Sequence, residues 1–166
     1  MLGFGEFKFA HVLKSILFFF GVLILNFSAL SIGGFFTADG VSSGWYETLH
    51  KAPWTPPGWV FGAAWTFLML CYSIYLTILY KRFEQKRTFW IIYSLQWVLN
   101  VSWNPVFFKF HQAILGLVLI FGLLGLIFYQ GISNRQVMRY HTAWILPYFL
   151  WLLIATSLNA YIVFNN

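Results

Sequence analysis

Five long apolar stretches, separated by short polar connections, limit what this chain can fold into. They cover residues 12–34, 58–80, 88–108, 113–133 and 140–164. A helix of about 20 residues crosses the hydrocarbon core of a bilayer, so each stretch is long enough to form a span. Only 8% of the residues are charged, against about a quarter in a soluble domain. The sequence therefore predicts an all-α integral membrane protein with a bundle of five transmembrane helices.

We expect one domain over residues 1–166, with a long first extramembrane loop at residues 35–57. Lys8 and Lys14 precede the first apolar stretch, as basic residues precede the apolar core of a signal peptide. The apolar run continues to about Phe36, however, without a cleavage site of small residues. We interpret it as a retained first span.

Lysine and arginine are distributed unevenly about the predicted spans. Eight lie in the N-terminal segment and in the connections at 81–87 and 135–139, whereas the other ends of the spans carry only Lys51 and Lys109. The positive-inside rule places the N-terminus inside and the loop at 35–57 outside. The basic residues lie singly or in short clusters beside apolar stretches, so the net charge of +6 indicates membrane topology. We expect no nucleic-acid partner.

The acidic residues and histidines predict neither a metal site nor acid–base catalysis. All four acids lie outside the predicted spans, and no two histidines have the spacing of metal ligands. The single cysteine, Cys71, lies in the middle of an apolar run and is interpreted as a small buried side chain. We therefore expect no metal, no required cofactor and no conventional catalytic residue.

Residues 45–65 concentrate rigid and aromatic side chains, with four of the nine tryptophans and three of the five prolines. Proline fixes φ and disfavours helix in the residue before it, so residues 45–57 are expected to form a stiff, irregular loop. A helix is expected to begin at Pro57 or Gly58. Indole rings suit either a membrane interface or the wall of a pocket for a flat ligand, and both interpretations are open at this point.

Three predicted spans place aromatic and amide side chains on one helical face, at positions i, i+4, i+7 and i+11. These stripes are Phe61, Trp65, Leu68 and Tyr72; Gln96, Asn100, Trp103 and Phe107; and Trp144, Tyr148, Trp151, Ala155 and Leu158. Aromatic stripes are typical of packing faces, but the amides of Asn100, Asn104 and Asn159 need partners or a polar cavity at hydrocarbon depth. They are interpreted as tethers between helices or as cavity residues. Pro105 and Pro147 are expected to kink their spans.

Residues in and after the segment 45–65 keep the spacing of a known family motif. The matching positions are Trp45, Tyr46, Leu49, Lys51, Trp54, Pro56, Pro57, Trp59, Val60, Phe61, Gly62, Trp65 and Thr66, then residues 99–104, Phe107, Phe108, Pro147, Tyr148, Trp151, Ala155, Thr156, Leu158 and Asn159. In these positions the chain resembles the TspO/MBR family of tryptophan-rich sensory proteins and translocator proteins, over about residues 41–165. Pro53 stands one place later than in the common motif. No basic residue follows Tyr161 to complete the sterol motif proposed for animal members, so high-affinity sterol binding is not implied.

The resemblance implies a five-helix bundle, usually dimeric, with a cavity between the helices that the first loop closes. Such proteins bind porphyrins and other flat hydrophobic ligands. The residues that the motif implies to line or close the cavity are Tyr46, Trp54, Pro56, Pro57, Trp65, Asn100, Trp103, Trp151, Ala155 and Leu158. The stripes add Phe61, Phe107 and Tyr148 as candidate ligand-binding residues. We expect Trp65 and Trp151 to face each other across the cavity.

We therefore expect a membrane receptor or sensor for porphyrins, other tetrapyrroles or similar planar apolar molecules. A transporter of porphyrin-like or sterol-like molecules is an alternative, although the sequence shows no internal repeat and no acid within the spans. A porphyrin-degrading enzyme is another, with Trp65 and Trp151 in the catalytic role. The expected partners are the lipid membrane and a second copy of the chain, packed through the glycine-containing span at 113–133. A bacterial membrane is favoured over the mitochondrial outer membrane.

Overall fold

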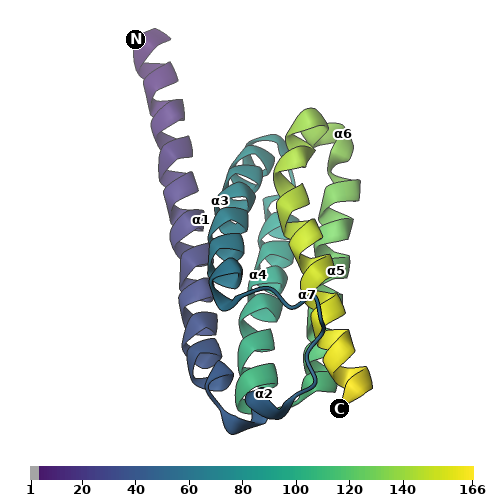
Figure 1. The fold of residues 1–166 in the computed structure, drawn as a ribbon. Helices are drawn as coiled ribbons and strands as arrows, with labels where there is room; N and C mark the ends of the chain where they lie inside the picture. The colour runs from purple at the N-terminus through teal and green to yellow at the C-terminus, as the bar shows by residue number, and fades with distance from the viewer. Residues whose placement is uncertain (1–3) are drawn as a thin grey trace.

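Long helices run side by side through the part of the chain that this computed structural model describes, residues 4–166 (Figure 1). They are α1 (Phe4–Val41), α3 (Gly58–Arg82), α4 (Lys86–Asn104), α5 (Ala113–Ser133) and α7 (Leu146–Asn165). α1 packs against α3 and α4, and α5 packs against α4 and α7. Side chains are described from His11 onward. No strand occurs among residues 4–166, so the predicted all-α fold is confirmed.

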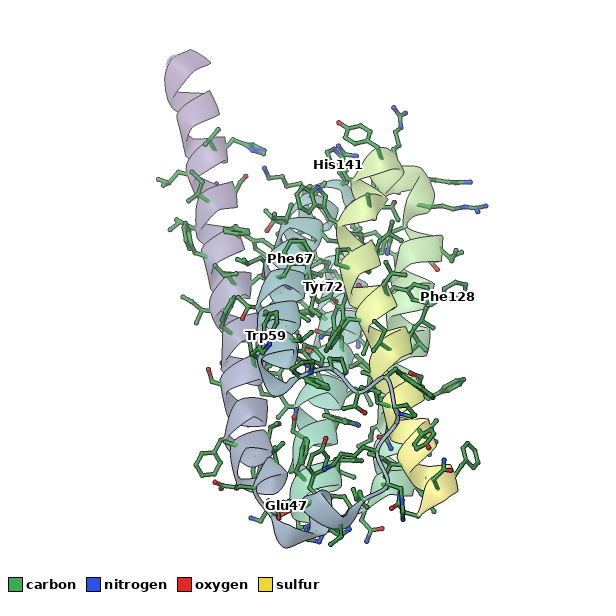
Figure 2. The ribbon with its side chains drawn as sticks, in the orientation of Figure 1. Glu47, Trp59, Phe67, Tyr72, Phe128 and His141 are labelled. Carbon is green, nitrogen blue, oxygen red and sulfur yellow. The ribbon has the colours of Figure 1, made fainter. Side chains whose placement is uncertain are left out.

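Shorter elements connect these helices at the two ends of the bundle. α2 (Gly44–Thr48) lies at the end where α1 finishes, and α6 (Arg135–Met138) lies at the opposite end (Figure 1). A π-helical turn, η1 (Pro105–Lys109), follows α4, and a 3₁₀ helix, η2 (Arg139–Ile145), precedes α7. The labelled side chains of Glu47 and His141 mark these two ends in Figure 2.

Four helical segments of the described chain are long and apolar enough to cross a membrane. They are His11–Val41, Gly58–Arg82, Ala113–Ser133 and Arg135–Asn165, and they coincide with four of the predicted spans. The remaining predicted span, 88–108, coincides with α4 and η1. α4 is less apolar because amides such as Gln96 and Asn100 lie on its buried face. The structure thus supports a multi-pass membrane protein.

Residues 35–57 were expected to form the first loop, but the first part of this range is helical. α1 continues past residue 34 to Val41, and α2 then forms within the segment predicted to be irregular. Ser43 caps α2, because its hydroxyl accepts a hydrogen bond from the N–H of Tyr46 at 3.3 Å. Apart from the turn at residues 42–43, helix is absent only from residues 49–57, the part that contains the three prolines.

The two prolines expected to kink spans have different effects. At Pro105, α4 gives way to the π-helical turn, in which the N–H of Phe110 donates to the carbonyl of Pro105 at 3.0 Å. Proline lacks an N–H and crowds the carbonyl four residues before it, so the regular α-helical pattern ends at this position. Pro147 lies in the first turn of α7, where the missing N–H costs no intrahelical hydrogen bond. The expected kink at Pro147 is therefore replaced by a helix start.

Tyrosines occupy the centre of the bundle, and their hydroxyls are paired. Tyr72 and Tyr75 are fully buried, and both hydroxyls bond to Gln130 of α5, that of Tyr75 donating to the backbone carbonyl at 3.0 Å. Figure 2 shows Tyr72 inside the bundle, whereas Phe128 points outward from α5. Apolar side chains on the outside and paired polar groups within suit a helix bundle surrounded by lipid.

Candidate functional site

The main cavity lies between the C-terminal halves of α1, α4 and α7 and the start of α3. Its volume is about 320 Å³, within the range of about 300 to 1,000 Å³ for small-molecule sites. The lining residues are Ala29, Leu30, Gly33, Gly34, Thr37, Ala38, Tyr46, Lys51, Thr55, Gly58, Phe61, Gly62, Trp65, Asn100, Trp103, Asn104, Phe107, Phe108, Ala155, Leu158, Asn159 and Ile162. This set is largely apolar, with a few amides and hydroxyls.

Small residues of α1 let this helix approach α4 closely along one wall. A Cβ atom on Gly33 would lie 2.5 Å from Nδ2 of Asn104, so a larger residue would displace the Asn104 side chain. One turn further along α1, the hydroxyl of Thr37 donates to Oδ1 of Asn104 at 2.7 Å and also contacts the carbonyl of Gly33. This contact fixes the wall and satisfies a polar group of α4 at hydrocarbon depth.

Aromatic rings form the walls on α3 and α4. Trp65 meets Tyr148 edge to face, with ring centroids 5.9 Å apart. Trp103 stacks on Phe107 at 5.3 Å with an interplanar angle of 15°, and Phe107 meets Phe108 at 5.0 Å. Consecutive phenylalanines both turn inward because the π-helical turn displaces one of them relative to an α-helix, and both are buried.

Two amides join the helices around the cavity. Asn159 of α7 accepts from the indole N–H of Trp103 at 3.0 Å, and its amide nitrogen donates to the carbonyl of Ala113 at 2.9 Å. Asn100 donates to the hydroxyl of Tyr148 at 3.0 Å, and Gln96 donates to the same oxygen at 2.8 Å. Both asparagines also line the cavity. The interpretation of Asn100 and Asn159 as interhelical tethers is therefore confirmed.

α2 and the proline-containing segment after it close one end of the cavity. Tyr46 packs against Phe107 and Phe108, and the ammonium of Lys51 lies 4.4 Å from the centre of the Tyr46 ring. Burial raises the pKa of the Tyr46 hydroxyl, so this group is neutral at physiological pH. Trp45 stacks on His111 at 4.3 Å and joins α2 to the connection after η1.

The same segment is also attached to the outside of α7. The indole of Trp54 donates to Ser157 at 3.2 Å and meets the ring of Tyr161 edge to face at 5.4 Å. The backbone N–H of His50 donates to Oδ1 of Asn166 at 2.8 Å. These few polar contacts hold residues 49–57 across the bundle, where Figure 1 shows the segment crossing α4 and α7 before α3 begins.

Eight of the thirteen predicted ligand-binding residues lie around this cavity. They are Tyr46, Phe61, Trp65, Asn100, Trp103, Phe107, Ala155 and Leu158. The other five do not line it: Trp54, Pro56, Pro57, Tyr148 and Trp151. Trp54, Pro56 and Pro57 belong to the segment that closes one end of the cavity, whereas Tyr148 and Trp151 pack against the lining residues Trp65 and Phe61.

The expectation that Trp65 and Trp151 face each other across the cavity is wrong. Trp65 lines the cavity, whereas Trp151 lies behind Phe61, with ring centroids 5.5 Å apart and the rings edge to face. Tyr148 is likewise fully buried behind Trp65. Trp54 is 54% exposed on the outer side of α7. Helical periodicity identifies the inward face but does not separate the wall from the layer that supports it.

The sequence predictions missed the α1 wall, together with Lys51, Thr55 and several residues of the other helices. Among the latter are Gly58, Gly62, Phe108 and Ile162, whereas Asn104 and Asn159, which also line the cavity, were expected as tethers or cavity residues. Gly33 and Gly34 are adjacent small residues, which permit a close helix approach. Gly58 and Gly62 are four residues apart and so share one face of α3. These signals fit a cavity wall once the first helix is known to continue through residues 35–41.

The arrangement suits binding. No acidic side chain lines the cavity among the described residues, and no three histidines, cysteines or acids of this part of the chain lie close enough to hold a metal ion. Lys51 is the lysine that lines the cavity, and it lies at the end that α2 closes. Aromatic faces, small residues and one cation favour a flat apolar molecule with a negatively charged edge.

Comparisons with known proteins relate the chain to one family. The model of the TspO/MBR family matches residues 20–164. The chain is 32% identical to the tryptophan-rich protein TspO of Archaeoglobus fulgidus over 94% of this chain and 99% of that protein. It is 34% identical to a protein of the same name from Bacillus cereus, over 69% of this chain and 76% of the relative. The bovine translocator protein is 29% identical over 78% of this chain and 80% of its own length.

Proposed function

This chain belongs to the TspO/MBR family, and we propose that it is a membrane receptor or sensor that binds porphyrins or other planar tetrapyrroles in the main cavity. The observation that carries the proposal is the set of side chains that line the cavity. Trp65 and Trp103 offer ring faces, and the small residues of α1 leave room beside them. Lys51 supplies a cation for the carboxylates that porphyrins carry at their periphery.

Entry of a macrocycle would depend on the segment 49–57. At about 320 Å³ the cavity is at the small end of the range for ligand sites, so a tetrapyrrole needs additional space. The segment is held to α7 by a few hydrogen bonds, such as those of His50 and Trp54. Movement of this segment would enlarge the cavity without disturbing the helices that form its walls.

The proposal is tested by titrating protoporphyrin IX into the purified protein and following tryptophan fluorescence. Trp65→Phe should raise the Kd about three- to tenfold, because ring stacking contributes roughly 0.5 to 1.5 kcal/mol. Trp59, which is 75% exposed and outside the cavity, provides the matched control, since Trp59→Phe should leave the Kd unchanged. Equal affinities of the wild type and both variants would place the ligand elsewhere.

The same preparation separates binding from the two alternative activities. Loss of porphyrin absorbance in the light but not in the dark would indicate oxidative breakdown. Net movement of porphyrin across sealed liposomes would indicate transport. Binding with neither change is the result that the receptor proposal predicts.

We also propose that α4 with η1 forms a fifth span and that the lysine-rich end of the bundle faces inside. Lys86–Lys109 is long enough to cross a bilayer at 1.5 Å per residue. In a Cys71→Ser background, a cysteine at Ser42 should react with a membrane-impermeant reagent from one side, and a cysteine at Gln136 from the other. Labelling of both from one side would contradict five spans, because the two positions would then be separated by an even number of crossings.

We also propose that the protein forms a homodimer in a bacterial cell membrane. α5 exposes a row of apolar side chains that includes Ile114, Val118 and Phe121, spaced as neighbours on one helical face. A second copy is a suitable partner for such a face in a bilayer, where helices associate by close packing. A strictly monomeric mass in mild detergent and in lipid nanodiscs would contradict the dimer.

A further inference from the structure

A second hollow lies at the opposite end of the bundle, between α1, the end of α3 and the start of α4. Its volume is about 250 Å³. Lys14, Lys81 and Lys86 line it together with His11, and no acidic side chain belongs to the lining that the structure describes. Three lysines from three helices therefore surround one space, at the end of the protein that we place inside.

The floor of this hollow is aromatic and well fixed. The rings of Phe18 and Tyr80 are stacked, with centroids 4.1 Å apart and an interplanar angle of 16°. Lys86 lies over the Tyr80 ring and donates to the backbone carbonyls of Tyr80 and Phe83, the latter at 2.7 Å. Lys86 thereby satisfies carbonyls at the end of α3, while its charge stays at the rim.

An apolar groove of about 560 Å³ adjoins this hollow on the membrane side of α1 and α3. Its walls are mainly aliphatic and aromatic, with Ile16, Phe20 and Ile78 among them. Ser15, Thr77 and Lys81 line both spaces, so the cationic hollow and the groove share a border. Figure 1 shows why the groove exists: the N-terminal half of α1 leans away from α3.

We propose that the hollow and the groove together bind one phospholipid with an anionic headgroup, such as a phosphatidylglycerol. Lys14 and Lys81 would contact the phosphate from two helices, and an acyl chain would occupy the groove. Basic pockets between transmembrane helices on the inner side favour anionic lipids. A choline headgroup would bring its own cation toward three lysines, so a zwitterionic lipid is disfavoured. This site is separate from the main cavity, because the two share no lining residue.

The test uses the full chain in detergent and three probes, each titrated by calorimetry. Dioctanoyl phosphatidylglycerol carries the anionic headgroup and the chains. Dioctanoyl phosphatidylcholine carries the same chains and a phosphate that its choline cation balances, and glycerol 3-phosphate carries the phosphate without the chains. Phosphatidylglycerol should bind most tightly. Binding of glycerol 3-phosphate with equal affinity would overturn the proposal in favour of a simple phosphate site.

Variants that remove positive charges distinguish a specific lipid site from general electrostatic attraction of the lipid to this end of the protein. Lys14→Gln with Lys81→Gln should weaken phosphatidylglycerol binding about thirtyfold, at roughly fivefold per lysine near a membrane surface. The matched control, Arg135→Gln with Arg139→Gln, removes two cations from the same end but outside the hollow, and should leave the affinity within about twofold. Equal losses in the two double variants would overturn the proposal.

A third variant tests the groove without changing the charge. Ser15 borders both spaces and bonds only to the carbonyl of His11 in the preceding turn, so Ser15→Leu fits the helix and fills the junction. It should weaken phosphatidylglycerol binding by about tenfold and leave thermal unfolding in detergent unchanged. Unchanged lipid affinity in a folded Ser15→Leu protein would overturn the proposed acyl-chain position.

Discussion

Filling the main cavity from Gly62 should weaken ligand binding and stabilise the protein at the same time. Gly62 lies in the first turns of α3 and lines the cavity, and a Cβ atom added there meets no atom within 4 Å. A leucine side chain therefore fits at this position of the cavity lining without a backbone shift. Replacing glycine inside a helix also removes an entropic cost of about 0.5 to 1 kcal/mol.

The size of the binding effect follows from the space that the leucine takes. Its side chain places four carbon atoms where the ligand would lie. If the ligand gives up contact equivalent to two methylene groups, at about 0.8 kcal/mol each, the loss is about 1.6 kcal/mol, or roughly fifteenfold in Kd. The effects on affinity and on stability have opposite signs, so general damage to the fold cannot explain both.

The assay combines a protoporphyrin IX titration with thermal unfolding in the same detergent. Gly21→Leu is the matched control: Gly21 is an exposed glycine of α1 outside the cavity, and its added Cβ atom also meets nothing within 4 Å. Gly21→Leu should stabilise the helix and leave the Kd unchanged. Normal porphyrin affinity in Gly62→Leu would refute the reasoning, because the ligand then does not use this space.

Two further outcomes are expected from residues that support the wall. Asn159→Ala should lower the free energy of unfolding by about 1 to 3 kcal/mol, because the indole N–H of Trp103 and the carbonyl of Ala113 lose their partner. Thermal unfolding measures this loss. The control Asn165→Ala removes only a donor to the carbonyl of Tyr161 and should change the stability little. Trp151→Phe should raise the porphyrin Kd by less than twofold, because the Trp151 ring packs against Phe61 and does not line the cavity. If the same titration shows a larger effect for Trp151→Phe than for Trp65→Phe, Trp151 contacts the ligand.

The sequence predicted the helical class and one end of the bundle as the site, because apolar runs and aromatic stripes follow directly from helix geometry. It did not predict which inward-facing side chains line the cavity and which lie one layer behind them. Phe61, Trp65 and Trp151 all lie on inward faces, and only the packing shows that Trp151 is one layer behind Phe61. A helical period specifies a direction around the axis, not a distance from the cavity.

The contribution of α1 was missed for a different physical reason. The wall that α1 provides is made of small residues, and a cavity wall of glycine and alanine carries no aromatic or polar signal. The predicted first span also ended at Gly34, whereas α1 continues to Val41. Packing against Asn104 holds the helix through this point, since Thr37 and Asn104 are hydrogen bonded across the contact. Tertiary contacts here outweigh the weak helix propensity of glycine.

The π-helical turn at the end of α4 restricts how the chain can change length. A π turn holds one more residue between its hydrogen-bonded groups than an α-helical turn does. Deleting one residue from Pro105–Lys109 would remove the extra residue of this turn and change the direction of Phe107 or Phe108 relative to Trp103. The stack of Trp103 on Phe107 and the packing of Tyr46 against both phenylalanines would then be lost. The connection at Glu84 and Gln85 is exposed and lies at the other end of α4, so a change of length there leaves these contacts in place.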